Sequence, residues 1–257
     1  MSEESLSTSV ERTTPRGLMA AIARNAAFQD YFTFTFHTYM LIRAHLAPDG
    51  EHTVIARPFA ITLWTVTLAA ILLGRGEILG PGKVRAGFYR VALFTPMVLS
   101  YFELRHLLPS LRPVLLDPEL HAIDRMLFGV TPSVFMAQWN TQPVVEWISF
   151  FYYSYFAMMA LILIPSLFFD GGDRLQELLT GAMLVCGLGH IGYTLVPGMG
   201  PWVTIPFDEP LHGGFWWHQV KVTVDAAGSQ LDIFPSLHTA YPAFFTLHAY
   251  GNRHRLP

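Results

Sequence analysis

Long apolar stretches separated by short polar segments are the dominant pattern along this chain. Three of them are nearly free of charge across their central turns, at 53–74, 143–169 and 175–197. Three more are interrupted by polar residues or proline, at 27–47, 86–104 and 233–251. A helix needs roughly 20 residues to cross about 30 Å of hydrocarbon. The pattern therefore predicts an all-α fold, a polytopic transmembrane helical bundle of about six spans.

The polar start of the chain predicts a tail outside this bundle. Residues 1–26 contain Glu3, Glu4 and Glu11 and three arginines, without a short apolar core followed by a small-residue cleavage site. We interpret 1–26 as a cytoplasmic tail and 27–257 as one transmembrane domain.

Two of the connections between the apolar stretches are long, at 105–142 and 198–232. The first contains LDPELHAIDRMLFGVTPS, in which Asp117 followed by Pro118 is typical of a capped helix start. The apolar residues that follow share one helical face: Leu120, Ile123 and Leu127. This face predicts either a short helix in the membrane interface or packing against the bundle.

Composition and charge exclude several classes of function. Hydrophobic residues make up 52% of the chain and charged residues 14%, and the mean hydropathy is +0.36, which is more apolar than a soluble fold of this size needs. The net charge is −3 and the 16 lysines and arginines are scattered, so we expect no nucleic-acid partner. The single cysteine, Cys186, excludes an internal disulfide and a cysteine-rich zinc site.

The positions of the basic residues predict the orientation, because lysine and arginine are retained on the cytoplasmic side. With the amino terminus inside, ten of the 16 basic residues lie inside. The other six lie at or near the outer face, and they are Arg43, Arg57, Arg105, Arg112, Arg125 and Lys221. Both long connections then lie outside, and we expect the protein in the plasma (inner) membrane.

The sharpest local signal is FPSLHT at 234–239, where a polar connection becomes the last apolar stretch. Pro235 suits a first helical turn, and the free N–H groups of such a turn favour a phosphate. Ser236 adds a hydroxyl, and His238 can protonate a departing alcohol oxygen. The alternative is a plain helix start, with Ser236 as the cap and His238 facing headgroups.

The longer segment FPSLHTAYP resembles the central motif of the type 2 phosphatidic acid phosphatase superfamily, in which the matching serine contacts phosphate and the matching histidine is the acid. GYTLVPGMGPW at 192–202 resembles the proline-rich turn of the branch that includes inositol phosphorylceramide synthases, and LDPELHAIDRMLFGVTPS resembles a segment that precedes it. The resemblance implies His238 as the catalytic acid, and we expect these phosphate ligands: Ser236, Lys221, Gly200 and Pro201.

Two departures from the family pattern affect the expected activity. The family's first motif supplies a lysine and an arginine for phosphate, and 192–202 contains neither. Its third motif brings an arginine, a nucleophilic histidine and an aspartate on a later helix. His254 lies 16 residues beyond His238, which is about 24 Å along a helix. We therefore expect the last catalytic helix and its nucleophile beyond Pro257, or a relative that has lost catalysis.

Other side chains are candidates for contacts with a headgroup, and they are His190, Tyr193, His212 and His218. His190 lies inside an apolar stretch, where an ionisable group is a functional candidate or is bonded to a neighbouring helix. The two histidines of the outer connection lie near two tryptophans, which are typical interfacial anchors. We interpret the aromatic run at 150–156 as packing.

These observations predict a membrane-embedded lipid phosphatase or phosphotransferase that works through a phosphohistidine intermediate. Its expected partners are a phosphorylated lipid and the bilayer, and we expect no cofactor and no metal. One alternative is a non-catalytic membrane protein of the same fold. The other is a haem or redox protein, which would use histidines in or near the apolar stretches: His37, His45, His190, His238 and His248.

Overall fold

The computed structural model describes residues 14–80, 82–111, 113–168, 172–227 and 230–253. Every regular element within them is a helix, which confirms the all-α prediction. The helices are α2 (Pro15–Asn25), α3 (Phe28–Leu46), α4 (Glu51–Arg75), α5 (Lys83–Ser110), α6 (Asp117–Phe128), α7 (Pro132–Ala137), α8 (Gln142–Phe168), α9 (Gly172–Leu195), α10 (Pro201–Thr204), α11 (Phe215–Ala227) and α12 (Leu237–Gly251).

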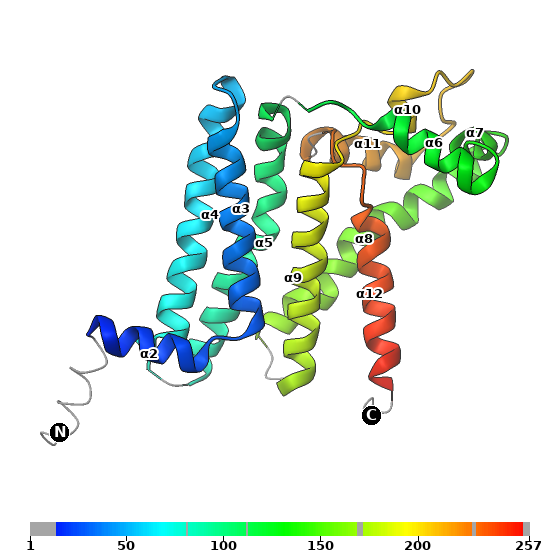
Figure 1. Ribbon diagram of the computed structural model, residues 1–257. Helices are drawn as coiled ribbons and strands as arrows, with labels where there is room; N and C mark the ends of the chain where they lie inside the picture. The colour runs from blue at the N-terminus through cyan, green and yellow to red at the C-terminus, as the bar shows by residue number, and fades with distance from the viewer. Residues whose placement is uncertain (1–13, 81, 112, 169–171, 228–229, 254–257) are drawn as a thin grey trace, which may run out of the picture.

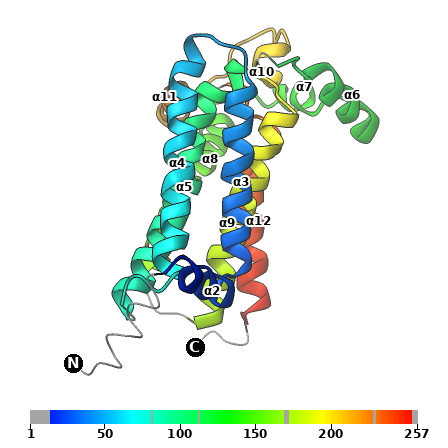
Figure 2. The ribbon, with the colours of Figure 1, turned by 60° about the vertical axis from the view of Figure 1, so that its left-hand side comes forward.

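The six apolar stretches form the six principal helices, α3, α4, α5, α8, α9 and α12. α3, α4 and α5 pack side by side, and α5 and α12 both pack against α9 (Figure 1). α8 crosses this group at a slant. The short helices α6, α7, α10 and α11 lie at one end of the bundle, and α2 lies across the other end (Figure 2).

Among the described residues, three helices are long and apolar enough to cross a membrane by length and composition, and these are α4, α8 and α9. α12 has only 15 residues, and α3 and α5 carry more polar side chains. Membrane crossing by α3, α5 and α12 therefore stays a prediction.

Asp30, a polar residue inside the stretch 27–47, is paired with residues of two neighbouring helices. Asp30 on α3 is 2% exposed and accepts a hydrogen bond from Nε of Arg75 at 2.9 Å. The hydroxyl of Tyr89 on α5 donates to the same carboxylate. A buried charge requires such partners. The pairing of Asp30 with Arg75 and Tyr89 therefore links α3, α4 and α5.

The predicted tail is partly ordered against the bundle. Thr14 caps α2 by accepting from the N–H of Gly17 at 3.1 Å, Ala21 is buried, and the Asn25 side chain donates to the carbonyl of Arg75 at 3.1 Å. Residues 1–13 lie outside the described part of the chain, and the cytoplasmic location of the tail stays a prediction.

The apolar face of α6 is not covered by the bundle. Ile123 and Leu127 are 47% and 66% exposed, and their neighbours Met126 and Phe128 are exposed as well. In Figure 1, α6 and α7 extend beyond the principal helices. This exposure agrees with the expectation that α6 lies in the membrane interface. It does not agree with the other expectation, in which the apolar face of α6 packs against the bundle.

Candidate active site

Three segments that are far apart in the sequence meet near the start of α12. The N–H of Leu116, before α6, donates to the carbonyl of Pro197 at 2.9 Å. Gly198 in turn donates to the carbonyl of Leu231 at 3.3 Å and forms an isolated β-bridge with Asp232. Backbone hydrogen bonds therefore join the first two stretches that carry the family resemblance to each other and to the residues just before the third.

Asp117 strengthens this junction in a way that differs from its predicted role. α6 begins at Asp117, and the residue in the N-cap position is Leu116, which cannot cap with its side chain. The Asp117 carboxylate is buried and accepts the N–H of Met199 at 3.0 Å and that of Gly200 at 2.8 Å. A buried carboxylate needs such donors, so Asp117 fixes the turn after α9 instead of capping α6. The N–H of Gly200, a predicted phosphate ligand, is bonded within the protein.

The backbone at Gly200 determines how the turn meets the segment before α12. Its φ of +87° is one that L-residues rarely adopt, and a Cβ there would lie 3.2 Å from Cγ2 of Ile233. Pro201 follows as the first residue of α10. Both predicted phosphate residues therefore belong to a turn that packs directly against Ile233.

A row of glycines on α9 lets the start of α12 approach closely. A Cβ at Gly192 would lie 2.3 Å from Cδ of Pro235, and one at Gly189 would lie 2.5 Å from Cδ2 of Leu237. Small residues permit such contacts between helices. Pro235 is thus docked on α9, and the prediction that it occupies the first helical turn is wrong, because α12 begins at Leu237 with Ser236 as its N-cap residue.

His238 lies among aromatic rings of α8. Its imidazole stacks on Tyr152 with a centroid separation of 3.9 Å and lies 4.1 Å from the ring of Tyr155. The Nδ1 atom of His238 is buried and has no hydrogen-bond partner. Buried polar atoms are nearly always paired, so this environment is unusual for a histidine that only packs. Ser236 is exposed, and its Oγ accepts a hydrogen bond from Thr239 at 3.2 Å.

Sequence reasoning missed the tyrosines around this site. Tyr152 and Tyr155, interpreted as packing, are the immediate neighbours of His238. Tyr101 on α5 hydrogen-bonds to Asp232, and the candidate headgroup residue Tyr193 on α9 hydrogen-bonds to the backbone at the start of α12. The only available signal was the spacing of Tyr152 and Tyr155, because residues three apart share a helical face.

His190 lies in the core and does not face headgroups, which corrects that expectation. It is 1% exposed, and its Nδ1 lies 2.8 Å from Oγ of Ser100 on α5. The Ser100 hydroxyl donates to the carbonyl of Met97 at 2.6 Å, so Nδ1 of His190 carries the proton in its bond to Ser100. The structure thus agrees with the alternative, a histidine bonded to a neighbouring helix.

The remaining candidate residues lie at the end of the bundle where α12 begins (Figure 1). Lys221 and His218 are exposed on α11, and His212 pairs with Glu209 at 3.0 Å. In the part of the chain that the structure describes, no group of three or more His, Cys, Asp or Glu side chains is arranged to hold a metal ion.

Comparison with known proteins identifies the family. A family model described as PAP2 superfamily matches residues 118–256, more than half of the chain. No curated protein and no solved structure matches. The matched region runs from α6 to α12 and includes the turn after α9 and the start of α12, and it supports a phosphatase-type activity on a phosphorylated substrate. This chain therefore belongs to the PAP2 superfamily.

Proposed function

We propose that this protein is a membrane-embedded lipid phosphatase or phosphotransferase, in the branch that resembles inositol phosphorylceramide synthases. Three observations support the proposal: the family match, the three apolar helices, and above all the meeting of three distant segments at the start of α12. The last observation is the strongest support. A helix start that long-range contacts hold in place is a preorganised binding site for a phosphate.

In the proposed reaction, the phosphate of a lipid headgroup binds at the first turn of α12. The N–H groups of Thr239 and Ala240 are bonded to the Ser236 carbonyl, so the N–H of His238 and the exposed Ser236 hydroxyl donate to the phosphate oxygens, and Lys221 contributes positive charge. As the bond between phosphorus and the leaving oxygen breaks, His238 gives its proton to that oxygen. The phosphoryl group passes to a nucleophilic histidine and then to water or to an alcohol.

The surface of α8 suits a lipid substrate that arrives from the side. Its outer face is strongly apolar, with Trp147 at 65% and Phe151 at 52% exposure. Phe151 directly precedes Tyr152, which with Tyr155 flanks His238. A headgroup at the start of α12 therefore leaves the acyl chains beside an apolar helix.

The nucleophile of the proposed reaction is not among the rings that surround His238. Within the described residues these rings are Tyr152, Tyr155 and Phe156, without a second imidazole. The activity test therefore uses the full natural protein, reconstituted in nanodiscs with phosphatidic acid as the probe substrate.

Substitution of His238 tests the proposal directly. We expect His238→Ala to lower phosphate release by about 10²-fold or more, because general-acid catalysis contributes that much, and Ser236→Ala to raise KM. His52→Ala, an exposed histidine on α4, is the matched control and retains activity. Undiminished turnover by His238→Ala removes His238 from the mechanism.

One observation favours a non-catalytic member of the family as the second candidate. The N–H groups of Met199 and Gly200 are bonded to Asp117, and residues 192–202 contain no lysine or arginine. Binding of phosphatidic acid that depends on Ser236, without phosphate release by the full protein, identifies this candidate. The haem alternative gains no support from His190 and His238, which lie against Ser100 and Tyr152 instead of facing a common cofactor.

A further inference from the structure

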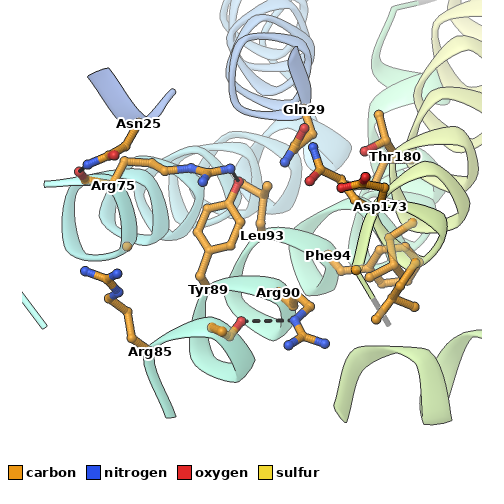
Figure 3. A pocket seen from close by; sticks show the side chains of 17 residues that line it. Asn25, Gln29, Arg75, Arg85, Tyr89, Arg90, Leu93, Phe94, Asp173 and Thr180 are labelled. Carbon is orange, nitrogen blue, oxygen red and sulfur yellow. Dashed lines mark hydrogen bonds between the residues drawn. The ribbon is translucent and has the colours of Figure 1, made fainter. Parts of the chain in front are cut away.

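A cavity lies at the opposite end of the bundle from the start of α12. It measures about 410 Å³. It lies where the end of α4 meets the starts of α3, α5 and α9, and the end of α2 also borders it (Figure 3). The side chains with polar heads on its wall are Asn25, Gln29, Arg75, Arg85, Tyr89, Arg90, Asp173, Gln176 and Thr180.

Arg75 shapes this cavity but is already paired. Its Nε binds Asp30 at 2.9 Å, and its Nη2 donates to the hydroxyl of Tyr89 at 2.8 Å. The guanidinium also lies over the Tyr89 ring, 4.2 Å from the centroid. Arg75 therefore has a structural role: it positions Tyr89 in the wall of the cavity.

Arg85 and Arg90 supply further positive charge from α5. Arg85 is half-buried and forms no ion pair with any residue in the described ranges. The Nε of Arg90 donates to the carbonyl of Ala86 at 3.3 Å, and Arg90 is engaged in a further interaction, so the proposed ligand contact is assigned to Arg85. Asp173 is the one carboxylate among the described lining residues, so arginines outnumber acidic groups on the wall.

Neutral hydrogen-bonding groups face these arginines across the cavity. In Figure 3, Arg75 and Arg85 lie on one side, and Gln29 and Thr180 lie on the other. Guanidinium, amide and hydroxyl groups around one space are the donors that bind phosphate oxygens.

The wall becomes apolar further into the bundle. Beyond Arg85 and Arg90, the lining of α5 continues with Leu93 and Phe94, and that of α9 continues beyond Asp173 with Leu179 and Met183. A cavity with a basic, polar outer part and an apolar inner part matches a molecule that joins a phosphate to a hydrocarbon chain.

We propose that this cavity is a phosphate-binding site for an anionic phospholipid headgroup, separate from the site at His238. Basic residues that only set membrane orientation lie at the surface. Arg24 and Lys83 are of that kind, because both are exposed and neither lines the cavity. Arg85 differs from them by lining a cavity that also offers neutral donors.

The test uses full-length protein that carries Ser236→Ala and His238→Ala, so that binding at the start of α12 does not contribute. The protein is placed in nanodiscs of phosphatidylcholine, with or without phosphatidic acid, and thermal unfolding is followed. A ligand that binds the native state raises the unfolding midpoint. Inorganic phosphate added to the phosphatidylcholine nanodiscs distinguishes the free anion from the lipid headgroup.

We expect phosphatidic acid to raise the midpoint. Arg85→Gln weakens the apparent affinity about tenfold, the effect of losing one charge-assisted hydrogen bond. Arg24→Gln, which removes the same charge outside the cavity, leaves the shift intact. Thr180→Phe, which fills the cavity without changing its charge, abolishes the shift.

Equal shifts in the parent and in all cavity variants overturn the proposal, as does an equal loss in Arg24→Gln, which would indicate a general surface-charge effect. A midpoint in pure phosphatidylcholine equal to that of the parent shows that each variant is folded. A shift with inorganic phosphate alone assigns the site to the free anion and overturns the lipid assignment. None of these outcomes depends on turnover at His238.

Discussion

The Asp117 carboxylate and the amides of Met199 and Gly200 form the contact on which the start of α12 depends. The carboxylate is buried, and its partners lie 82 and 83 positions later in the chain. The turn that it holds packs against Ile233, three residues before Ser236. Asp117, at the start of α6, therefore helps to position the candidate phosphate site at Ser236 through the turn that contains Met199 and Gly200.

Asp117→Asn tests this contact. Asparagine keeps one acceptor oxygen but loses the charge and turns an amide donor toward other donors. We expect the free energy of unfolding to fall by about 1–3 kcal/mol, the range for a buried group left without its partner, and phosphate release to fall with it. Thermal unfolding in detergent measures the first effect.

Asp124→Asn is the matched control for this prediction. Asp124 lies on the same helix, and no hydrogen bond or ion pair of its side chain occurs within the described ranges. If both variants unfold at the same temperature, Asp117 does not stabilise the turn.

At the scale of elements, the fit of α12 on α9 depends on glycine. Gly181, Gly189 and Gly192 each face a side chain from α12 or from the residues just before it, at separations that exclude a methyl group. These contacts place the first turn of α12 beside the turn after α9. The two helices therefore behave as one unit at the candidate site.

Gly192→Ala is expected to push Pro235 off α9. The added Cβ would lie 2.3 Å from Pro235 Cδ, and overpacking of this kind lowers the free energy of unfolding by about 1–3 kcal/mol. Gly87→Ala on α5 is the control, because a Cβ there has no neighbour within 4 Å. The control is expected to be neutral or stabilising by about 0.5–1 kcal/mol. Thermal unfolding compares the two, and a Gly192→Ala midpoint at or above that of Gly87→Ala contradicts the prediction.

The sequence predicted the positions of the principal helices closely, because a long apolar run determines a helix locally. The stretch 53–74 became Glu51–Arg75, and 143–169 became Gln142–Phe168. The last helix begins four residues later than its apolar stretch, at Leu237, because Pro235 is held by α9 and not by its own helix.

The sequence predicted only some of the residues of the candidate site, and the reason is physical. Ser236 and His238 were found because they belong to one short motif. Asp117, Tyr101 and Asp232 were missed because their roles depend on contacts between segments far apart in the chain. No local pattern of hydrophobic and polar residues encodes such contacts.

The whole molecule has two chemically different ends, and its proposed orientation can be tested. Glu119 on α6 and Lys83 on α5 are exposed at opposite ends of the bundle. In intact cells, a membrane-impermeant maleimide is expected to label Glu119→Cys, and to label Lys83→Cys only after permeabilisation. The parent protein stays unlabelled, because its own Cys186 is buried.

Labelling of both positions from one side contradicts a bundle that crosses the membrane. Labelling of Lys83→Cys alone in intact cells reverses the orientation, so that the amino terminus lies outside. Both results leave the all-α architecture unchanged.

The long separation between Asp117 and its partners has a consequence for biogenesis. During synthesis the carboxylate leaves the ribosome 82 residues before the Met199 amide, and it stays hydrated until those amides arrive, since burying it alone is unfavourable. If α8 and α9 insert into a membrane as proposed, we expect α6 to stay at the membrane surface until they have done so. The end of the bundle that contains His238 is the last to assemble, and a chain arrested before residue 199 leaves it open.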